Sequence, residues 1–522
     1  MRRANCTVAA ALLLVGLAAH AAPAEYANPV IPGDAPDPSV VRVQGVYWAA
    51  ATTSEWLPAF QVLRSTDLVN WQPAGAIFRE PPAWTKGSYW APELGHDGRR
   101  FTVHYTARNH KEGLCVAFAT APKATGPWTD HGPLVCEDAG SIDGFPVRDE
   151  KGVAYLIWKY DGNSLKAPTP LSAQQLSPDG TRLVGEKTEL IHNDVPWEGE
   201  LVEGPFVMRR GPYFYMFYSA NGCCGVRCIY ALGVARSKAL LGPWEKNPAN
   251  PILSSNEDWR CPGHGGVVKG PGGRDFLLYH AYAAKGFERV GRQGLLDELK
   301  WGEDGWPSIN GGRGPSTRAA TPFGKPRVAR AFRDSFTKRA LAPDWQWPQA
   351  RPARAQQRAG SLTLESVGSQ DTRLAAVLGV PIPSDRFVAT TSVRIGSSPS
   401  TSAPGLALYG DSENAIGVSV VAGKAILWRR DKKRDSVLSE TPVASAATPR
   451  LRVQGLGEGR FRFEQSADGK TWTELPSGTV EGRALTPWDL SIRAALLAGP
   501  GGAATFDDFA LEALPPAADL PR

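Results

Sequence analysis

Short runs of apolar, β-branched and aromatic residues, each bounded by a turn that contains Gly or Asp, recur through residues 26–318. The run Val46-Tyr-Trp-Ala-Ala-Ala51 follows the turn Gln44-Gly45, and the run Tyr213-Phe-Tyr-Met-Phe-Tyr218 follows the turn Arg209-Arg-Gly211. Such runs predict strands, and no stretch shows the apolar period of a long helix. The pattern therefore predicts an all-β protein.

A tryptophan marker repeats at a nearly constant interval within this region. The first copy is Arg64-Ser-Thr-Asp-Leu-Val-Asn-Trp71, and Gly126-Pro-Trp128 and Gly242-Pro-Trp244 end two others. The intervals from Trp71 through Trp128 and Trp244 to Trp301 are 57, 116 and 57 residues, and a copy near residue 186 lacks its Trp. Five units of about 58 residues, each of about four strands, predict a five-bladed β-propeller over residues 25–318.

A second domain follows the propeller. Residues 308–330 are rich in Gly, Pro and Arg, which is typical of a linker, and we place the linker at residues 319–333. Beyond it, residues 386–393, 415–421 and 424–428 read as sandwich-like strands. We expect a jelly-roll-like β-sandwich over residues 334–515.

The first residues have the features of a secretory signal peptide. Met1-Arg-Arg precedes an apolar run over residues 8–19, and small residues then form an Ala-x-Ala site. We therefore expect residues 1–24 to be removed and the protein to be secreted or periplasmic. No later run reaches the roughly 18 apolar residues of a membrane span, so no membrane partner is expected.

Composition narrows the function classes. Gly 55 and Pro 44 in 522 residues fit many tight turns, and 17 Trp suggest flat apolar surfaces in the core or against sugar rings. The net charge of +6 is not gathered into a basic stripe with interleaved aromatics, which argues against nucleic-acid binding. Neither a phosphate-cradling Gly-rich loop nor a G-x-S-x-G elbow is present, which disfavours kinase, dinucleotide and α/β-hydrolase chemistry.

Six cysteines remain once the signal peptide, with Cys6, is removed. An even number in an exported protein favours disulfides over a zinc site, because no second C-x-x-C pair faces the Cys-Cys-x-x-x-Cys group. The pairing is left open. The six are Cys115, Cys136, Cys223, Cys224, Cys228 and Cys261.

In each repeat we single out the residue at a fixed distance before the turn glycine. The distance is eight residues in four of the units and nine residues in the third. Because the first strand of each blade lies nearest the propeller axis, these residues should meet at one end of the channel. A single Asp or Glu here could be a turn former, but three carboxylates at one phase repel one another and indicate a functional site. Trp90 is either core or a platform for a sugar ring, and His264 is as readily structural as functional. The set is Asp37, Trp90, Asp143, Glu203 and His264.

These residue types fit glycoside hydrolysis. Two carboxylates that flank a glycosidic bond supply a general acid and either a general base or a nucleophile. A third carboxylate beside the acid raises its pKa by like-charge repulsion.

Ordered motifs around these residues resemble glycoside hydrolase family 43. They are Asn28-Pro-Val-Ile-Pro-Gly-Asp-Ala-Pro-Asp37, Trp90-Ala-Pro-Glu, Ser141-Ile-Asp143, Val202-Glu203-Gly-Pro-Phe and Pro262-Gly-His264-Gly. The resemblance implies that Asp37 is the general base, Glu203 the general acid and Asp143 the modulator of the acid's pKa. It also implies a substrate-side role for Arg292 and a possible axial calcium or water site at His264. The C-terminal part resembles the concanavalin-A-like sandwich appended to xylosidases and arabinofuranosidases of this family.

From the resemblance we expect an exported inverting hydrolase that releases β-D-xylose or α-L-arabinofuranose from plant cell-wall polysaccharides or their oligomers. Two alternatives are an endo-arabinanase of the same family and a non-catalytic carbohydrate-binding propeller. We expect no required cofactor, apart from the possible structural Ca²⁺, and a carbohydrate as the binding partner; the oligomeric state is left open. The sandwich is expected to stabilise the propeller or shape its pocket, with passive carbohydrate binding as the alternative.

Overall fold

The protein was analysed as a computed structural model, which describes residues 24–323, 331–368, 373–395, 403–445, 447–483, 485, 491–500 and 502–515. Strands dominate these residues, and their helical segments are 3₁₀ turns of three or four residues. The all-β expectation is thereby confirmed. Residues 1–23 of the predicted signal peptide lie outside the described residues. None of the described helices is long and apolar enough to cross a membrane.

Five four-stranded antiparallel sheets, called blades one to five here, make up the first domain. Blade one is β2 (Ser39–Val43), β3 (Val46–Ala50), β5 (Ala59–Ser65) and β6 (Gln72–Phe78). Blade two is β7 (Thr85–His96), β8 (Phe101–Asn109), β9 (Leu114–Ala121) and β10 (Thr129–Val135). Blade three is β11 (Ser141–Arg148), β12 (Ala154–Tyr160), β13 (Leu171–Leu176) and β14 (Leu183–Ile191). Blade four is β15 (Val202–Arg210), β16 (Tyr213–Ala220), β17 (Ala231–Ser237) and β18 (Glu245–Lys246), and blade five is β19 (Trp259–Lys269), β20 (Asp275–Ala283), β21 (Gln293–Trp301) and β22 (Pro307–Ile309).

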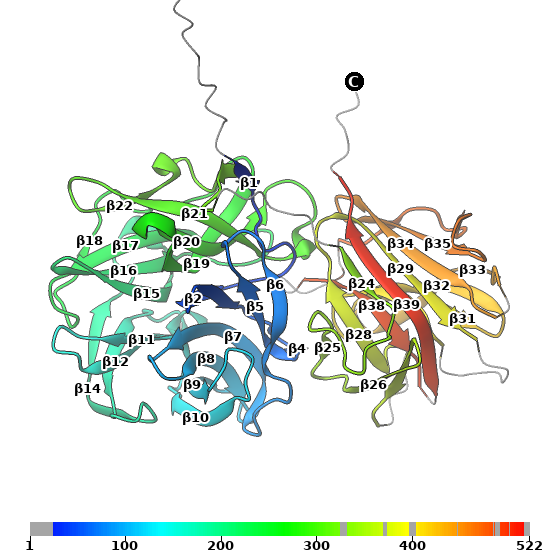
Figure 1. The fold of residues 1–522 in the computed structure, drawn as a ribbon, viewed down its shortest axis with the longest axis horizontal. Coiled ribbons are helices and arrows are strands. Elements are labelled where there is room, and N and C mark those ends of the chain that lie inside the picture. The colour runs from blue at the N-terminus through cyan, green and yellow to red at the C-terminus, as the bar shows by residue number, and fades with distance from the viewer. Residues whose placement is uncertain are drawn as a thin grey trace, which may run out of the picture.

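The first strands of the blades form a closed ring. Each of β2, β7, β11, β15 and β19 contacts the next, and β19 contacts β2 (Figure 1). The ends of the domain are tied together, because β1 (Glu25–Ala27) pairs with β23 (Arg318–Ala320). This arrangement is the propeller, and its five sheets are consistent with the five repeats of the sequence.

The repeated tryptophans have a common local role. The indole N–H of Trp71 donates to the carbonyl of Leu68 at 2.8 Å, that of Trp128 to Ala124 at 3.2 Å and that of Trp244 to Leu240 at 3.0 Å. Each bond closes the turn that leads toward the fourth strand of its blade. The sequence repeat therefore records a repeated hydrogen bond as well as a repeated packing position.

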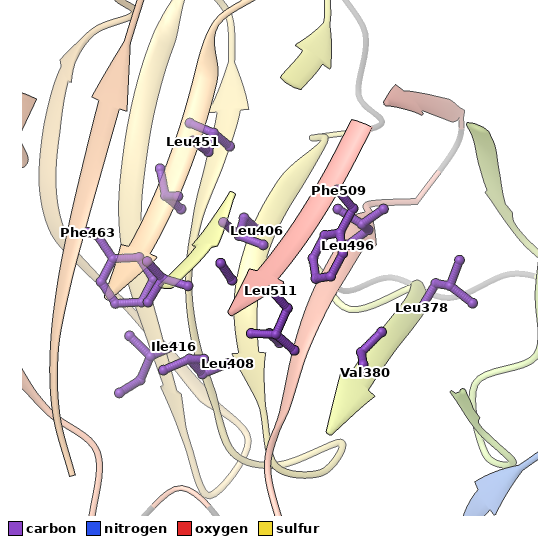
Figure 2. Packing of buried hydrophobic residues seen from close by; sticks show 14 of the residues in the cluster. Leu378, Val380, Leu406, Leu408, Ile416, Leu451, Phe463, Leu496, Phe509 and Leu511 are labelled. Carbon is purple, nitrogen blue, oxygen red and sulfur yellow. The ribbon is translucent and has the colours of Figure 1, made fainter. Parts of the chain in front are cut away.

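The second domain is a β-sandwich of two antiparallel sheets. One sheet contains β24 (Phe332–Asp334), β26 (Ala353–Arg358), β27 (Ser361–Ser366), β29 (Arg386–Arg394), β34 (Arg450–Gly457), β35 (Arg460–Ser466), β36 (Thr473–Glu474), β37 (Val480–Glu481) and β39 (Ala503–Ala513). The other contains β28 (Ala376–Pro381), β30 (Gly405–Tyr409), β31 (Ala415–Val421), β32 (Lys424–Asp431), β33 (Arg434–Pro442) and β38 (Arg493–Ala498). Figure 2 shows the core between them, where Leu406, Leu451, Phe463, Leu496 and Phe509 are buried.

The sandwich packs on the loops of blades one and five. β4 (Trp56–Leu57), in the loop after β3, pairs with β25 (Trp347–Pro348) beside the sandwich (Figure 1). The Trp56 ring meets Tyr409 edge to face at 5.4 Å, and the Phe287 ring of blade five meets Phe461 at 5.7 Å. These contacts join the two domains across two separate loops of the propeller.

Three disulfides are present, and they pair all six cysteines expected to remain. They are Cys115–Cys136, Cys223–Cys224 and Cys228–Cys261. The first and third close chain loops of 21 and 33 residues, whereas the second joins neighbours in the sequence.

Loop closure predicts different effects of these disulfides on stability. The double change Cys115→Ala/Cys136→Ala should lower the free energy of unfolding of the propeller by about 3 kcal/mol, because a 21-residue loop regains its freedom in the unfolded chain. The disulfide between Cys223 and Cys224 closes no loop, so the matched change Cys223→Ala/Cys224→Ala should alter the free energy of unfolding by less than about 0.5 kcal/mol. Denaturant unfolding followed by tryptophan fluorescence measures both. Equal losses in the two variants would contradict the loop-closure account.

Candidate functional site

Each blade carries a residue with a left-handed backbone on or just before its first strand, near the axis; β7 and β19 have a second one, at Ser88 and Cys261. The φ angles are +51° at Asp37, +45° at Ala91, +57° at Asp143, +60° at Gly204 and +40° at His264. Residues other than glycine rarely adopt this backbone conformation, and such strained residues are found most often at functional sites. The backbone therefore marks the same axial position in all five blades.

The residues expected from the repeat are offset by one position in two blades. Asp37, Asp143 and His264 are themselves the left-handed residues, whereas Trp90 and Glu203 immediately precede theirs, Ala91 and Gly204. At Gly204 a Cβ would lie 2.9 Å from the His264 ring, so glycine allows the close approach. A count along the sequence finds the axial region but not this offset, because the residue number between strand and turn differs among blades.

Asp37 is buried and held by a dense set of contacts. Its carboxylate accepts a hydrogen bond from Arg292 at 3.0 Å and another from the Thr52 hydroxyl at 2.7 Å, and its backbone N–H donates to Nδ1 of His280 at 3.0 Å. Burial alone would raise the pKa of Asp37, but the charges of Arg292 and then His264 outweigh it and hold the pKa well below its ordinary value. Asp37 therefore stays ionised to a lower pH than an ordinary aspartate does.

Glu203 is also buried and paired with a cation. Lys159, whose side chain is 1% exposed, donates to one carboxylate oxygen at 2.8 Å, and the Tyr230 hydroxyl donates to the other at 2.8 Å. Burial would raise the pKa of Glu203, but Lys159 and Tyr230 lower it further than burial raises it. Lys159 also contacts Asp161 at 3.0 Å, so its own charge is neutralised on two sides.

Asp143 lies next to Glu203. One of its carboxylate oxygens accepts the N–H of Gly204 at 3.0 Å and is 3.9 Å from Nδ1 of His264. Burial raises the pKa of Asp143 to about 7, with the Glu203 charge adding to burial and His264 opposing it. Of the three axial acids, Asp143 therefore keeps its proton to the highest pH. The role of Asp143 as modulator of the Glu203 pKa stays a prediction.

His264 faces two of the acids. Its Nδ1 lies 3.4 Å from Asp37 and 3.9 Å from Asp143, and its backbone N–H donates to Ser219. Among the described residues, no group of three or more His, Cys, Asp or Glu side chains is arranged to hold a metal ion. Calcium prefers six to eight oxygen ligands, which this donor set does not supply. The calcium expectation stays a prediction, and no step below uses a metal.

Trp90 and Arg292, the two residues expected on the substrate side, have different surroundings. Trp90 is half-buried on β7 and pairs with Thr106, whose hydroxyl accepts the N–H of Asp143 at 3.1 Å. Arg292 is buried against Asp37. Trp90 therefore lies at the level of the acids, whereas Arg292 stabilises the charge of Asp37.

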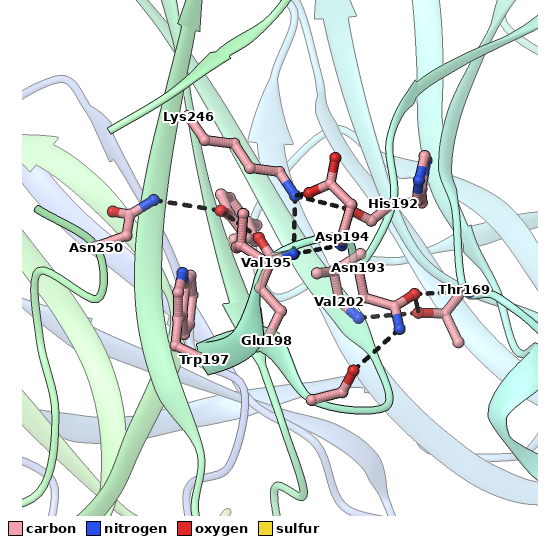
Figure 3. Close-up of polar contacts among 12 residues, drawn as sticks. Thr169, His192, Asn193, Asp194, Val195, Trp197, Glu198, Val202, Lys246 and Asn250 are labelled. Atoms are coloured by element: carbon pink, nitrogen blue, oxygen red, sulfur yellow. Dashed lines mark hydrogen bonds and ion pairs between the residues drawn. The ribbon is translucent and has the colours of Figure 1, made fainter. Parts of the chain in front are cut away.

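A polar network stands behind the start of β15 (Figure 3). The N–H of Val202 donates to the Thr169 hydroxyl at 2.9 Å, and Asn193 accepts the N–H of Thr169 at 3.3 Å. In the same segment Lys246 donates to the fully buried Glu198 at 2.8 Å. These contacts hold the segment before Glu203 between blades three and four.

Sequence reasoning missed several partners of the acids. Lys159, Tyr230, His280 and Thr52 all lie on or beside second and third strands of their blades. One signal was available: Lys159 continues the apolar strand Tyr155-Leu-Ile-Trp158, and a buried lysine requires an anionic partner.

A cavity of about 530 Å³ lies elsewhere, between the propeller and the sandwich. Its lining includes Trp71, Leu63, Phe332 and Val380, and none of the axial acids lines it. It is thus separate from the carboxylate cluster.

The fold and this cluster define a class of protein. A propeller axis that gathers three buried carboxylates, two paired with cations and one with a raised pKa, fits the acid–base chemistry of a glycoside hydrolase. The chain belongs to the glycosyl hydrolases family 43, whose model matches residues 26–307. The model of the β-xylosidase C-terminal concanavalin A-like domain matches residues 333–488.

Known proteins support this membership. The xylosidase/arabinosidase 43B of Humicola insolens is 30% identical over 369 residues, which are 66% of this chain and 67% of that protein. The non-reducing end α-L-arabinofuranosidase BoGH43B of Bacteroides ovatus is 26% identical over 84% of each chain. The chain spans about three fifths of the length of several other curated relatives that it matches. In fold, it resembles the GH43 BlXynB protein of Bacillus licheniformis, with a TM-score of 0.82 at 22% identity over 94% of this chain and 100% of that one.

The Arg292–Asp37 contact predicts a change in the acidic limb of the pH–rate profile. Arg292 lowers the pKa of Asp37, so Arg292→Gln should raise that pKa and protonate the carboxylate at a higher pH. Activity should then be lost at a higher pH than in the wild type, with a larger deficit at pH 5 than at pH 7. The profile of kcat/KM for an aryl pentoside measures the shift. Lys300→Gln, which removes an exposed charge from the neighbouring strand β21, is the control, and an unmoved limb in Arg292→Gln would contradict the assignment.

Proposed function

We propose that the protein is an exported, inverting glycoside hydrolase that releases single pentose units, β-D-xylose or α-L-arabinofuranose, from the ends of plant cell-wall oligomers. The observation that carries this proposal is that two buried carboxylates near the propeller axis each form an ion pair: Asp37 with Arg292, and Glu203 with Lys159. A sugar-binding propeller without activity has no use for three buried carboxylates at one axis, two of which need a buried cation as partner. The relatives from Humicola insolens, a xylosidase/arabinosidase, and from Bacteroides ovatus, an α-L-arabinofuranosidase, support the two sugars.

In the proposed mechanism the two carboxylates act on opposite faces of the sugar. Asp37 accepts a proton from a water molecule as that water attacks the anomeric carbon. Glu203 donates a proton to the glycosidic oxygen and becomes an anion, which Lys159 and Tyr230 stabilise through their hydrogen bonds. Glu203 must carry a proton when the substrate binds, and the charge of an ionised Asp143 favours this by raising the pKa of Glu203.

Action at chain ends is supported by the position of the sandwich. The loops of blades one and five that contain Trp56 and Phe287 lie at the same end of the propeller as Asp37 and Arg292, and both pack on the sandwich. One side of the rim is therefore covered. An endo-acting arabinanase needs a cleft open at both ends, so release of pentose monomers in place of short oligomers is the expected result.

Export is supported by the three disulfides, which form and persist in oxidising compartments. Mass spectrometry of the unreduced protein, isolated from the medium or periplasm, should find six cysteines in disulfides and an N-terminus near residue 25. Free thiols in such material would argue against export.

Activity assays test the substrate class directly. Aryl β-D-xyloside and aryl α-L-arabinofuranoside should be cleaved, one or both, while aryl hexosides should not. Absence of turnover on both pentosides would overturn the proposal.

The general-acid role of Glu203 predicts a dependence on the leaving group. Glu203→Ala should lower kcat on a natural oligosaccharide by about 10²–10⁴-fold. Its effect on an aryl glycoside with a good leaving group should be much smaller, because that group departs with little protonation. Steady-state kinetics on both substrates measure the ratio. Glu200→Ala, an exposed carboxylate three residues upstream, is the matched control, and equal losses on both substrates would contradict the role.

The base role of Asp37 predicts the stereochemistry of the product. If Asp37 activates water and forms no bond to the sugar, the reaction is a single displacement and the first product has the opposite anomeric configuration to the substrate. Proton NMR of the product, recorded before mutarotation, measures it. Retention of configuration would overturn both the mechanism and the role of Asp37.

A further inference from the structure

The loop over residues 221–230 is the feature that the mechanism leaves unexplained. It joins β16 to β17 in blade four, where Ser219 pairs with Glu203 and Ala220 pairs with Ala231. The loop therefore rises from the end of the blade that holds the candidate general acid. It contains three of the six paired cysteines, in the sequence Asn221-Gly-Cys-Cys-Gly-Val-Arg-Cys228.

Covalent and hydrogen bonds fix the shape of this loop. Cys228 is joined to Cys261 of blade five, and Cys223 is joined to its neighbour Cys224. The N–H of Ile229 donates to the carbonyl of Gly222 at 3.0 Å, and the N–H of Gly225 donates to the Tyr282 hydroxyl at 3.2 Å. A loop held in this way presents one surface, at a low cost in entropy when a ligand binds.

The underside of the loop touches the acid through one side chain. Tyr230, which is 1% exposed, packs with Cys228, Cys261 and Tyr282, and Cys223 packs against this cluster. The same Tyr230 donates its hydroxyl hydrogen to Glu203 at 2.8 Å. The disulfide of Cys223 and Cys224 thus packs on the same cluster that holds the Tyr230 ring against Glu203.

Two apolar side chains of the loop face solvent, and the exposed Arg227 lies between them in the sequence. Val226 is 56% exposed and Ile229 63% exposed, and Cys223 and Cys224 are half-buried. Leu165, 62% exposed, lies in the corresponding loop of the adjacent blade three. Three of the eight large apolar side chains exposed in the described part of the chain are therefore on two neighbouring rim loops, and such a cluster indicates a contact surface.

The position of this surface identifies its occupant. A general acid protonates the oxygen that links the released sugar to the rest of the chain, so the next sugar must leave on the side of Glu203. On the opposite part of the rim, the loops of blades one and five are covered by the sandwich. Blades three and four lie on the side away from the sandwich (Figure 1), where the substrate chain has room to continue.

We propose that Cys223–Cys224, Val226 and Ile229 form a rigid apolar platform that binds the sugar unit on the leaving-group side of the scissile bond. The proposal rests on the proposed function. The C–H face of a pentose ring lies on the disulfide and the two aliphatic side chains, while its hydroxyl groups remain in water. The polarisable sulfur atoms add contact without introducing strong polar groups that would need partners. The platform makes the protein prefer a sugar over a small alcohol as the leaving group.

The test compares two substrates that share the released pentose and differ in the leaving group. One is the disaccharide and the other the methyl glycoside of whichever pentose the wild-type protein cleaves. The variants Val226→Ser/Ile229→Ser and Cys223→Ser/Cys224→Ser should lower kcat/KM on the disaccharide by about tenfold, equivalent to roughly 1.4 kcal/mol. On the methyl glycoside, which has no ring for the platform, the loss should be less than about twofold. Leu241→Ser, an exposed apolar residue at the other end of blade four, is the control and should change neither value.

The two proposals fail in different ways. If the wild-type protein cleaves both substrates but the platform variants lose the same activity on each, or lose none on either, the platform is overturned. The proposed function then still stands. A wild-type protein that cleaves neither substrate overturns the proposed function and the assigned occupant with it. Thermal unfolding of Cys223→Ser/Cys224→Ser guards against misfolding, and the Val226→Ser/Ile229→Ser variant, which keeps all disulfides, supplies the decision if that protein is unstable.

Discussion

Burial of three carboxylates around one axis is the constraint on which the rest of the site depends. Charges taken out of water are costly unless each has a partner of opposite charge or a proton. Arg292 pairs with Asp37, Lys159 pairs with Glu203, and Asp143 has its pKa raised to about 7 and can remain protonated. The cluster therefore uses two solutions to one electrostatic problem: an ion pair at Asp37 and at Glu203, and a raised pKa at Asp143. The way in which burial is tolerated thus sets Asp143 apart from the other two acids.

The propeller supplies these partners from fixed places. The acids stand at the left-handed residues near the axis or one position before them. Their cations come from neighbouring strands. Lys159 pairs across the ladder with Ile142, next to Asp143, and Arg292 lies just before β21. A left-handed residue turns the chain locally, so the side chain of Asp37 or Asp143 can face the axis while the strand continues in the blade. The strain of that conformation is acceptable because the ladders on either side hold the backbone.

The sequence predicted the parts of this structure that depend on repetition. Trp71, Trp128 and Trp244 recur because each closes the same turn, and the axial acids recur because first strands are equivalent. Partners such as Lys159 and His280 could not be found in this way, since their approach depends on register shifts in β11 and β19 that no local pattern encodes. The pairing of Cys223 with Cys224 was equally hidden, because an even number of cysteines does not specify which of them meet. The contacts of the sandwich depend on the docking of two finished domains.

That docking connects the second domain to the chemistry. Arg493, buried in the sandwich, contacts Asp34 at 3.2 Å, three residues before Asp37. The N–H of Ile492 donates to the carbonyl of Arg289, three residues before Arg292. The sandwich therefore contacts both chain segments that form the Arg292–Asp37 ion pair. The loops around Glu203 are held instead by hydrogen bonds and disulfides within the propeller. Removal of the sandwich would free both segments of the ion pair that keeps Asp37 charged, so in this protein the docking of the second domain and the electrostatics of Asp37 are one interaction.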